Sequence, residues 1–213
     1  MIYELTTYDL QPNSVAEAER RFAEAYAERR KLSELAASFH TEIGPLNQVV
    51  QIWPYESFGQ REELTARAAR SGAWPPVLGG LLLGERSELF VPLAFSPPLA
   101  PGSLGPFFEL RLYTLADESD LPKLIRGWEA ALPARLERGP LAAAWRSEPA
   151  AAKKFLHLWP YPSLDERWRL RREIRAAGLW PPAVVAKRLG LPAWRVVRQE
   201  NRILVPSAFS PLQ

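Results

Sequence analysis

Four residues in the C-terminal half have side chains that could transfer a proton beside an anion-binding group. Glu109, Arg111 and Tyr113 alternate along one extended segment, and His157 lies on another segment that we expect to pair with it. Alternate residues of a strand project from one face, so the four groups should converge. An imidazole near a carboxylate and a phenol can serve as a general base, while an arginine fork can hold an anion. These four are our candidate catalytic residues.

Other polar and aromatic residues share the parity of this set on neighbouring predicted strands. We expect the apolar alternates, such as Ile52 and Leu158, to face the helices and the polar alternates to face the space between two sheets. Buried polar groups must either pair with each other or line a pocket, and both interpretations stay open. For a pocket, the candidate ligand-binding residues are Trp53, Tyr55, Trp159, Tyr161, Glu4, Tyr8, His40 and Arg146.

Composition excludes several kinds of chemistry. The 213 residues include no cysteine, which rules out disulfides, zinc–thiolate sites, iron–sulfur clusters and thiol nucleophiles. The two histidines are too few for most transition-metal sites, so we expect neither a metal nor a cofactor. Ligation of haem iron by His157 is the one cofactor role left open.

Charge and hydropathy patterning indicate the class of partner. The formal net charge is +3, and basic residues are interleaved with acids, as in residues 17–21 and 165–169. We therefore expect no binding to nucleic acid. The chain opens on a strand-like segment rather than a signal peptide, and its longest apolar stretch, residues 77–83, is too short to cross a membrane. We expect a cytoplasmic protein that binds a small molecule and could form homo-oligomers through its outer surfaces.

The chain contains an internal repeat. Four blocks recur in the same order, at shifts of 105, 106, 106 and 114 residues. Their first residues pair as Tyr3 with Phe108, Gln51 with His157, Gly72 with Gly178, and Phe90 with Leu204. Four ordered matches indicate a duplication, with the extra eight residues falling between the third and fourth blocks, where loops tolerate insertion. The boundary lies in the Pro/Gly-rich segment 96–106.

Within each half, the periodicities predict the element order βαββαβ, which is a ferredoxin-like motif. The first half should have strands at residues 2–10, 37–43, 48–55 and 88–95 and helices at 14–35 and 57–72. The second half repeats this order at 107–115, 120–137, 141–148, 153–161, 163–178 and 202–209. One such unit covers only one face of its sheet with helices. The sequence therefore predicts an α+β fold in which tandem ferredoxin-like domains, 1–98 and 105–213, form a fused dimeric-type α/β barrel.

Three segments resemble the NIPSNAP family of the dimeric α/β barrel superfamily: residues 2–8 (IYELTTY), 41–55 (TEIGPLNQVVQIWPY) and 201–212 (NRILVPSAFSPL). The resemblance covers nearly the whole chain in two tandem copies and implies the same barrel. The superfamily includes cofactor-free oxygenases, muconolactone-type isomerases and haem enzymes, so the resemblance implies no single activity. The arginine that is usual after Glu-Leu in the family's first strand is Thr6 here, whereas the second copy keeps Arg111.

Our leading functional interpretation is non-covalent binding of a small aromatic or apolar molecule in the barrel interior. One alternative is a cofactor-free oxygenase or isomerase that uses the candidate catalytic residues. Another is an adaptor whose outer helices bind a protein. Because Thr6 and Gln51 stand where the second half has Arg111 and His157, we expect a site for a carboxylate or enolate to lie nearer the second half.

Overall fold

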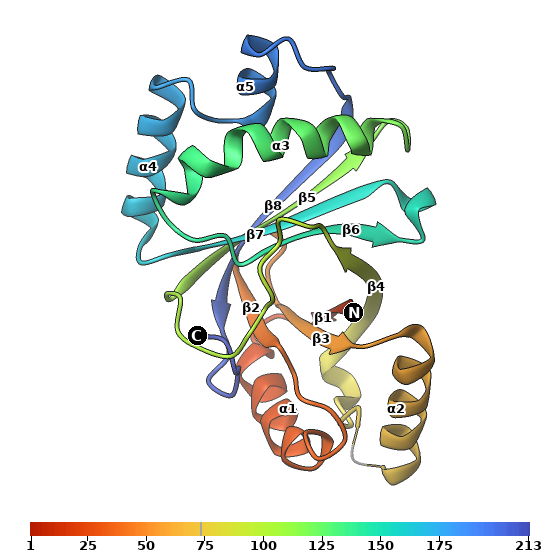
Figure 1. Ribbon diagram of the computed structural model, residues 1–213. Helices are drawn as coiled ribbons and strands as arrows, with labels where there is room; N and C mark the ends of the chain where they lie inside the picture. Colours follow the sequence, from red (N-terminus) through yellow and green to blue (C-terminus); the bar gives the residue numbers. More distant parts are fainter. Residues whose placement is uncertain (73) are drawn as a thin grey trace. The chain divides into compact units, whose positions relative to one another are not determined.

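The first repeat forms the predicted βαββαβ order. The structure, a computed structural model, describes residues 1–72 and 74–213. The elements of this repeat are β1 (Ile2–Leu10), α1 (Val15–Arg29), β2 (Ala37–Ile43), β3 (Gln48–Tyr55), α2 (Phe58–Ser71), the short 3₁₀ helix η1 (Gly79–Leu81) and β4 (Leu82–Pro92) (Figure 1).

The second repeat has the same order with one added helix. Its elements are β5 (Phe107–Leu115), α3 (Asp120–Leu136), β6 (Ala143–Glu148), the 3₁₀ helix η2 (Ala150–Ala152), β7 (Lys154–Tyr161), α4 (Leu164–Ala176), α5 (Pro182–Arg188) and β8 (Val196–Pro206). The added helix α5 lies where the sequence comparison places the extra residues. It begins with a proline, whose fixed backbone angle suits the first turn of a helix.

The chain divides into two compact units whose boundaries cross those of the repeats. The first unit comprises residues 1–92, 99–103 and 202–213, and the second comprises 93–98 and 104–201. Each repeat therefore contributes its last residues to the unit built mainly by the other repeat. Equivalent hydrogen bonds fix the two ends: Leu93 N donates to Ala144 O at 3.0 Å in the second unit, and Ser207 N donates to Ser38 O at 2.9 Å in the first.

The strands of each unit form antiparallel pairs. In the first unit the order is β4-β1-β3-β2, with the C-terminal end of β8 beside β2. In the second unit, β7 lies between β5 and β6. Arg111 of β5 is directly opposite His157 of β7. This register confirms that the two strands with the candidate catalytic residues are neighbours.

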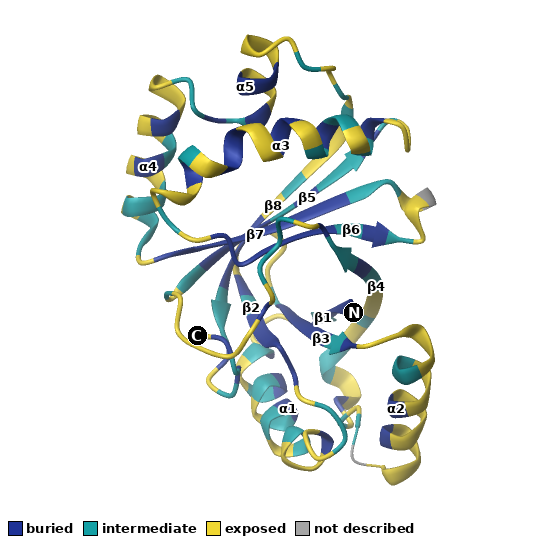
Figure 2. Cartoon of the chain, viewed as in Figure 1, coloured by how far each residue is buried: buried dark blue, intermediate teal, exposed yellow. Residues whose placement is uncertain are grey.

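Helices pack on the sheet of their own unit and bury aromatic side chains against it. The Phe22 ring of α1 lies 4.7 Å from that of Tyr8 on β1, and the Trp128 ring of α3 lies 4.8 Å from that of Phe155 on β7. The outer sides of the helices are exposed, whereas β3 and β7 are buried along almost their whole length (Figure 2). The sheet residues that face the helices therefore lie in a nearly water-free layer.

Element boundaries differ from the predicted ones in three places. Helix α1 ends at residue 29 rather than 35, while β4 begins at 82 rather than 88 and β8 at 196 rather than 202. The early parts of both strands carry exposed charged side chains, so apolar alternation does not mark them. Among the described residues, no helix combines the length and the apolar character that a membrane span requires.

Candidate functional site

The polar candidate residues on the strands lie against the helices of their own unit. In the first unit, Arg61 of α2 forms an ion pair with Glu4 of β1 at 2.5 Å. In the second unit, Arg167 of α4 forms the equivalent ion pair with Glu109 of β5 at 2.6 Å. The prediction that the polar alternates face away from the helices was therefore wrong.

Two tryptophans show the same reversal. The Trp53 ring lies 6.1 Å from that of Tyr26 on α1, and the Trp159 ring lies 6.2 Å from that of Trp128 on α3. Both had been predicted to point to the other side of the sheet.

Burial on both faces of the strands explains the error. Tyr3 and Leu5, on the opposite face of β1, are 2% and 5% exposed, and Glu4 is 7% exposed. Since neither face reaches solvent, apolar character does not identify the side that the helices cover. Arginines from the helices supply the partners that the buried polar side requires.

Arg29, the last residue of α1, is a buried cation beside aromatic rings. Its guanidinium carbon lies 4.5 Å from the centroid of the Trp53 ring, and its Nη2 donates to the Tyr55 hydroxyl at 3.4 Å. The Nε atom has no partner, and among the described residues no carboxylate lies within ion-pair distance of this side chain, which is 2% exposed. Burial lowers the pKa of the Arg29 guanidinium, because desolvation disfavours the charged form.

Two carboxylates lie near this cation in different surroundings. Glu4 is buried and accepts hydrogen bonds from Arg61 and from the Ser87 hydroxyl. Glu85 of β4 is exposed, and it has no hydrogen bond or ion pair within the part of the chain that the structure describes. Desolvation, and then the charge of Glu4, raises the pKa of Glu85. Of the two carboxylates near Arg29, one is thus paired, and the other has no partner among the described residues.

These groups surround a cavity of about 170 Å³ in the first unit, which we call the first-unit cavity. Four predicted ligand-binding residues line it: Glu4, Tyr8, Trp53 and Tyr55. Helices α1 and α2 add Arg29, Arg61 and Thr65. Thr6 of β1, Glu85 of β4 and Trp74 also line the cavity. Desolvation, and then the charge of Glu85, raises the pKa of the Tyr8 hydroxyl, which therefore stays protonated.

The matching carboxylate of the second unit is surrounded by cations. Glu109 is 1% exposed. It lies 2.6 Å from Arg167, 3.5 Å from Arg171 and 3.8 Å from Arg111, measured between charged atoms. The Tyr161 hydroxyl donates to it at 3.5 Å. Three arginines and a tyrosine hydroxyl therefore engage this carboxylate.

His157 is enclosed and already hydrogen-bonded. The indole N–H of Trp159 donates to its Nδ1 at 2.8 Å, so the proton of the neutral ring lies on Nε2. Burial, and then the positive charge of Arg111, lowers the pKa of His157 well below its ordinary value. The Tyr113 ring lies 5.2 Å away. Because Nε2 carries the proton and Nδ1 is occupied, this residue does not fit the role of a proximal haem ligand.

Gln51 makes the same contact in the first repeat. The indole N–H of Trp53 donates to Gln51 Oε1 at 3.3 Å. Glutamine cannot exchange a proton near neutral pH, so the shared function of Gln51 and His157 is to accept this hydrogen bond and orient the tryptophan.

Two threonines of the first unit are replaced by arginines in the second unit. Thr6 and Thr65 line the first-unit cavity. At the equivalent positions, shifted by 105 and 106 residues, the second repeat has Arg111 and Arg171. In the second unit, two long guanidinium side chains therefore occupy the positions at which the first unit has two short hydroxyls.

His40 and Arg146 lie outside both clusters. His40 Nδ1 is 3.0 Å from Glu19 of α1, and this hydrogen bond raises the pKa of the imidazole. Arg146 pairs with Glu148 at 2.6 Å and borders a cavity of about 200 Å³ that Lys153 also lines. Within the described residues, no group of three His, Asp or Glu side chains could hold a metal ion.

Sequence analysis missed the arginines that the helices supply. Arg29 recurs as Arg135 and Arg61 recurs as Arg167, each at a shift of 106 residues. The guanidinium carbon of Arg135 lies 4.0 Å from the centroid of the Trp159 ring. Arg29 is placed over the Trp53 ring in the same way. The recurrence of arginine at equivalent helix positions of the two repeats was the signal that could have identified them.

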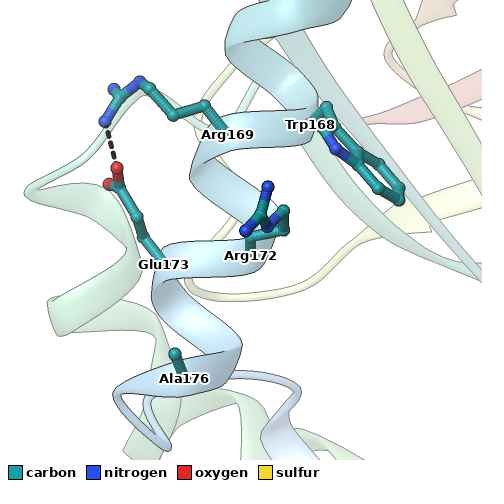
Figure 3. Close-up of a pocket in the computed structure, with 5 residues that line it drawn as sticks. All are labelled: Trp168, Arg169, Arg172, Glu173 and Ala176. Carbon is teal, nitrogen blue, oxygen red and sulfur yellow. Dashed lines mark hydrogen bonds and ion pairs between the residues drawn. The ribbon is translucent and has the colours of Figure 1, made fainter.

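The outer side of α4 is exposed, whereas Arg167 and Arg171 on the same helix pair with Glu109. Trp168, Arg169, Arg172, Glu173 and Ala176 border a shallow groove of about 430 Å³ (Figure 3). Trp168 is 62% exposed, and Arg169 pairs with Glu173 at 2.6 Å. This groove lacks the enclosed apolar walls typical of a small-molecule site.

Comparison with known proteins gives family matches over both repeats. The model of the NIPSNAP family matches residues 3–97 and 108–211. The NipSnap homolog of Dictyostelium discoideum is 37% identical over 73 residues, which are 34% of this chain and 33% of that protein. NipSnap homolog 3A of Homo sapiens is 27% identical over 225 residues, covering 100% of this chain and 86% of that protein. The two segments confirm the predicted tandem copies.

A solved structure shares the fold over nearly the whole chain. The crystal structure described as a "putative monooxygenase" from Lactobacillus acidophilus matches with a TM-score of 0.64 and 10% sequence identity, covering 97% of this chain and 94% of that chain. At this identity the likeness concerns the fold alone. It confirms the predicted α+β fold class of tandem ferredoxin-like repeats.

Proposed function

The chain belongs to the NIPSNAP family, and from that premise we propose that it binds a small single-ring molecule in the first-unit cavity. The site differs from the one expected from the sequence, because it lies between a sheet and its own helices. Its predicted aromatic and acidic lining residues are retained. The observation that carries the proposal is a cavity bordered by four aromatic side chains and a buried arginine that has no carboxylate partner in the described part of the chain.

The size of the cavity supports a ligand of about one ring. Its volume is about 170 Å³. An engineered apolar cavity of about 150 Å³ accepts benzene, whereas drug-sized ligands occupy pockets of roughly 300–1,000 Å³. A single ring with a short substituent fits this range, and a fused-ring or haem-sized group does not.

The lining supports recognition of a flat molecule with a polar edge. The Trp53 and Trp74 rings lie 5.2 Å apart at an interplanar angle of 70°, so they present a face and an edge. Aromatic rings favour such edge-to-face arrangements. Polar hydrogen-bonding groups, including the hydroxyls of Tyr8 and Thr65, border the same space. A ring could therefore gain aromatic contacts and one or two hydrogen bonds.

The enzyme alternative depends on the second-unit residues and receives less support. A general base must be free to reach the proton it removes. His157 Nδ1 already accepts from Trp159, and Glu109 is paired with arginines. The adaptor alternative would use an outer surface such as the α4 groove, where Trp168 is exposed.

The test is calorimetric titration with a neutral single-ring probe, benzyl alcohol. We expect saturable binding to the wild-type protein. Thr65→Arg should weaken it about tenfold or more, because the added side chain would fill the cavity. Arg171 shows that the fold accepts arginine at the equivalent position. Thr65→Ser, which keeps the hydroxyl and removes only a methyl group, is the matched control, and equal affinity of the wild-type and Thr65→Arg proteins would refute the proposal.

A further inference from the structure

The second unit shows what occupies the region beside its buried carboxylate. Guanidinium groups of Arg111 and Arg171 approach Glu109 at 3.8 and 3.5 Å. In the first repeat both positions are threonines, and both threonines line the first-unit cavity. The cavity thus lies beside Glu4, which lacks the two arginines that Glu109 has at these positions.

The net charge of the lining residues also makes the first-unit site more negative than its counterpart. In the first unit, Glu4 and Glu85 balance Arg29 and Arg61 among the cavity residues. The position of Glu85 recurs as Gln199, at the shift of 114 residues. At the equivalent positions, the second unit therefore has one acid, Glu109, and four arginines. Relative to its counterpart, the first-unit site is more negative by three charges.

Of the two carboxylates that line the first-unit cavity, Glu85 has no counterion among the described residues. Glu85 borders the cavity, and the part of the chain described by the structure provides it with no hydrogen bond or ion pair. The charge of Glu4 adds to desolvation in raising the pKa of Glu85. A bound cation would offset these effects, because an opposite charge nearby favours the ionised carboxylate.

Three aromatic rings that border the cavity could also attract a cation. Trp53, Trp74 and Tyr8 border the cavity, and the negative faces of such rings attract ammonium and guanidinium groups. Arg29 already lies over the Trp53 ring at 4.5 Å, so the unit uses this interaction within its own chain. Trp74 and Tyr8 have no such cation placed over them among the described residues.

We propose that the first-unit cavity selects a small organic cation, an amidinium, guanidinium or amine attached to one ring, which takes the place of the arginine side chains of the second unit. This inference rests on the proposed function and specifies its ligand class. The cationic group lies toward Glu85 and the ring lies among the aromatic residues. No bond is made or broken, and recognition is by charge and shape.

The test compares three probes of nearly equal size by calorimetric titration at neutral pH: benzamidinium, neutral benzamide and anionic benzoate. We expect benzamidinium to bind most tightly and benzoate least. Glu85→Gln should weaken benzamidinium by about fivefold, the scale of a partly exposed ion pair, and leave benzamide unchanged. Glu88→Gln, on the same strand outside the cavity lining, is the control.

The outcomes separate the two proposals. Benzoate binding at least as tightly as benzamidinium, or a Glu85→Gln variant that binds benzamidinium as the wild type does, overturns the choice of a cation but leaves small-molecule binding intact. If none of the three probes or benzyl alcohol binds, the proposed function itself fails. Glu85 is exposed, so its replacement by glutamine should not disturb folding, and a matching thermal midpoint checks this.

Discussion

A histidine and a glutamine occupy equivalent positions in the two repeats and make the same contact. His157 and Gln51 both accept a hydrogen bond from the indole N–H two residues further along their strands. The nitrogen that remains on each side chain, Nε2, is buried and has no hydrogen-bond partner among the residues that the structure describes. The arrangement therefore depends on an acceptor at this position and not on a titrating group.

The tautomer of His157 can be checked directly, because the chain has only one other histidine. We expect long-range ¹H–¹⁵N spectra to show a neutral ring with its proton on Nε2 that does not titrate in the ordinary histidine range, as burial lowers its pKa. A ring protonated on Nδ1, or one that titrates near pH 6.5, would contradict this geometry.

His40 should titrate in the opposite direction within the same experiment. Its hydrogen bond to Glu19 raises its pKa above the ordinary value. A raised folded-state pKa means that the pair stabilises the fold fully below pH 6.5 and that the contribution is lost as pH rises through the folded-state pKa. Urea unfolding of wild-type and His40→Gln proteins should therefore differ most at acidic pH, by no more than about 1 kcal/mol. A difference that grows toward alkaline pH would contradict this.

At the scale of elements, α3 depends on a glycine to approach its neighbours. A β-carbon at Gly127 would overlap the ring of Trp194 and touch Ala186 of α5. The sequence contains a glycine in mid-helix, which ordinarily costs roughly 1 kcal/mol relative to alanine. Close packing of Trp194 and Ala186 against Gly127 offsets that cost.

Replacing this glycine should destabilise the protein despite the better helix propensity. We expect Gly127→Ala to lower the free energy of unfolding by about 1–2 kcal/mol, since overpacking costs about 1–3 kcal/mol. In a Trp194→Leu background the same replacement should become neutral or stabilising, because the obstructing ring is gone. Urea denaturation of the four proteins checks this, and a stabilising effect of the alanine in the wild-type background would show that the contact is not tight.

Sequence patterns predicted the order of helices and strands correctly but not which face of each strand packs against the helices. The four repeat blocks gave the βαββαβ order and the neighbouring strands of Arg111 and His157, because these depend on local periodicity and on the duplication. The face of each strand was predicted wrongly, since residues on both faces of β1 are buried. The cavity could not be predicted, because it depends on helix residues such as Arg29 and Thr65 whose distance from the strands is set by tertiary packing.

At the scale of the whole chain, the two repeats depend on each other through their exchanged ends. Residues 202–213 belong to the first unit and residues 93–98 to the second. Ser38 N donates to Ser210 Oγ at 2.9 Å, and Ala144 N donates to Ser96 Oγ at 3.0 Å, which is the same bond in both units. A strand edge left without its partner segment is open to pairing with another chain.

An isolated first repeat, residues 1–98, should therefore form a homodimer that exchanges these ends. In the intact chain, β2 pairs with the end of β8, which the fragment lacks. A second copy can supply its own residues 93–98 in that place, as identical chains commonly exchange elements. Light scattering should give twice the fragment mass. A folded monomer at micromolar concentration would contradict the prediction.

Binding of a ring between the sheet and helices of the first unit can be tested by a crystal structure of the wild-type protein soaked with benzamidinium. We expect density for one ring beside Trp53 and Trp74, with the amidinium next to Glu85 and the matching region beside Glu109 filled by Arg111 and Arg171. Probe density beside Glu109, or a first-unit cavity that stays free of probe at saturating concentration, would contradict it.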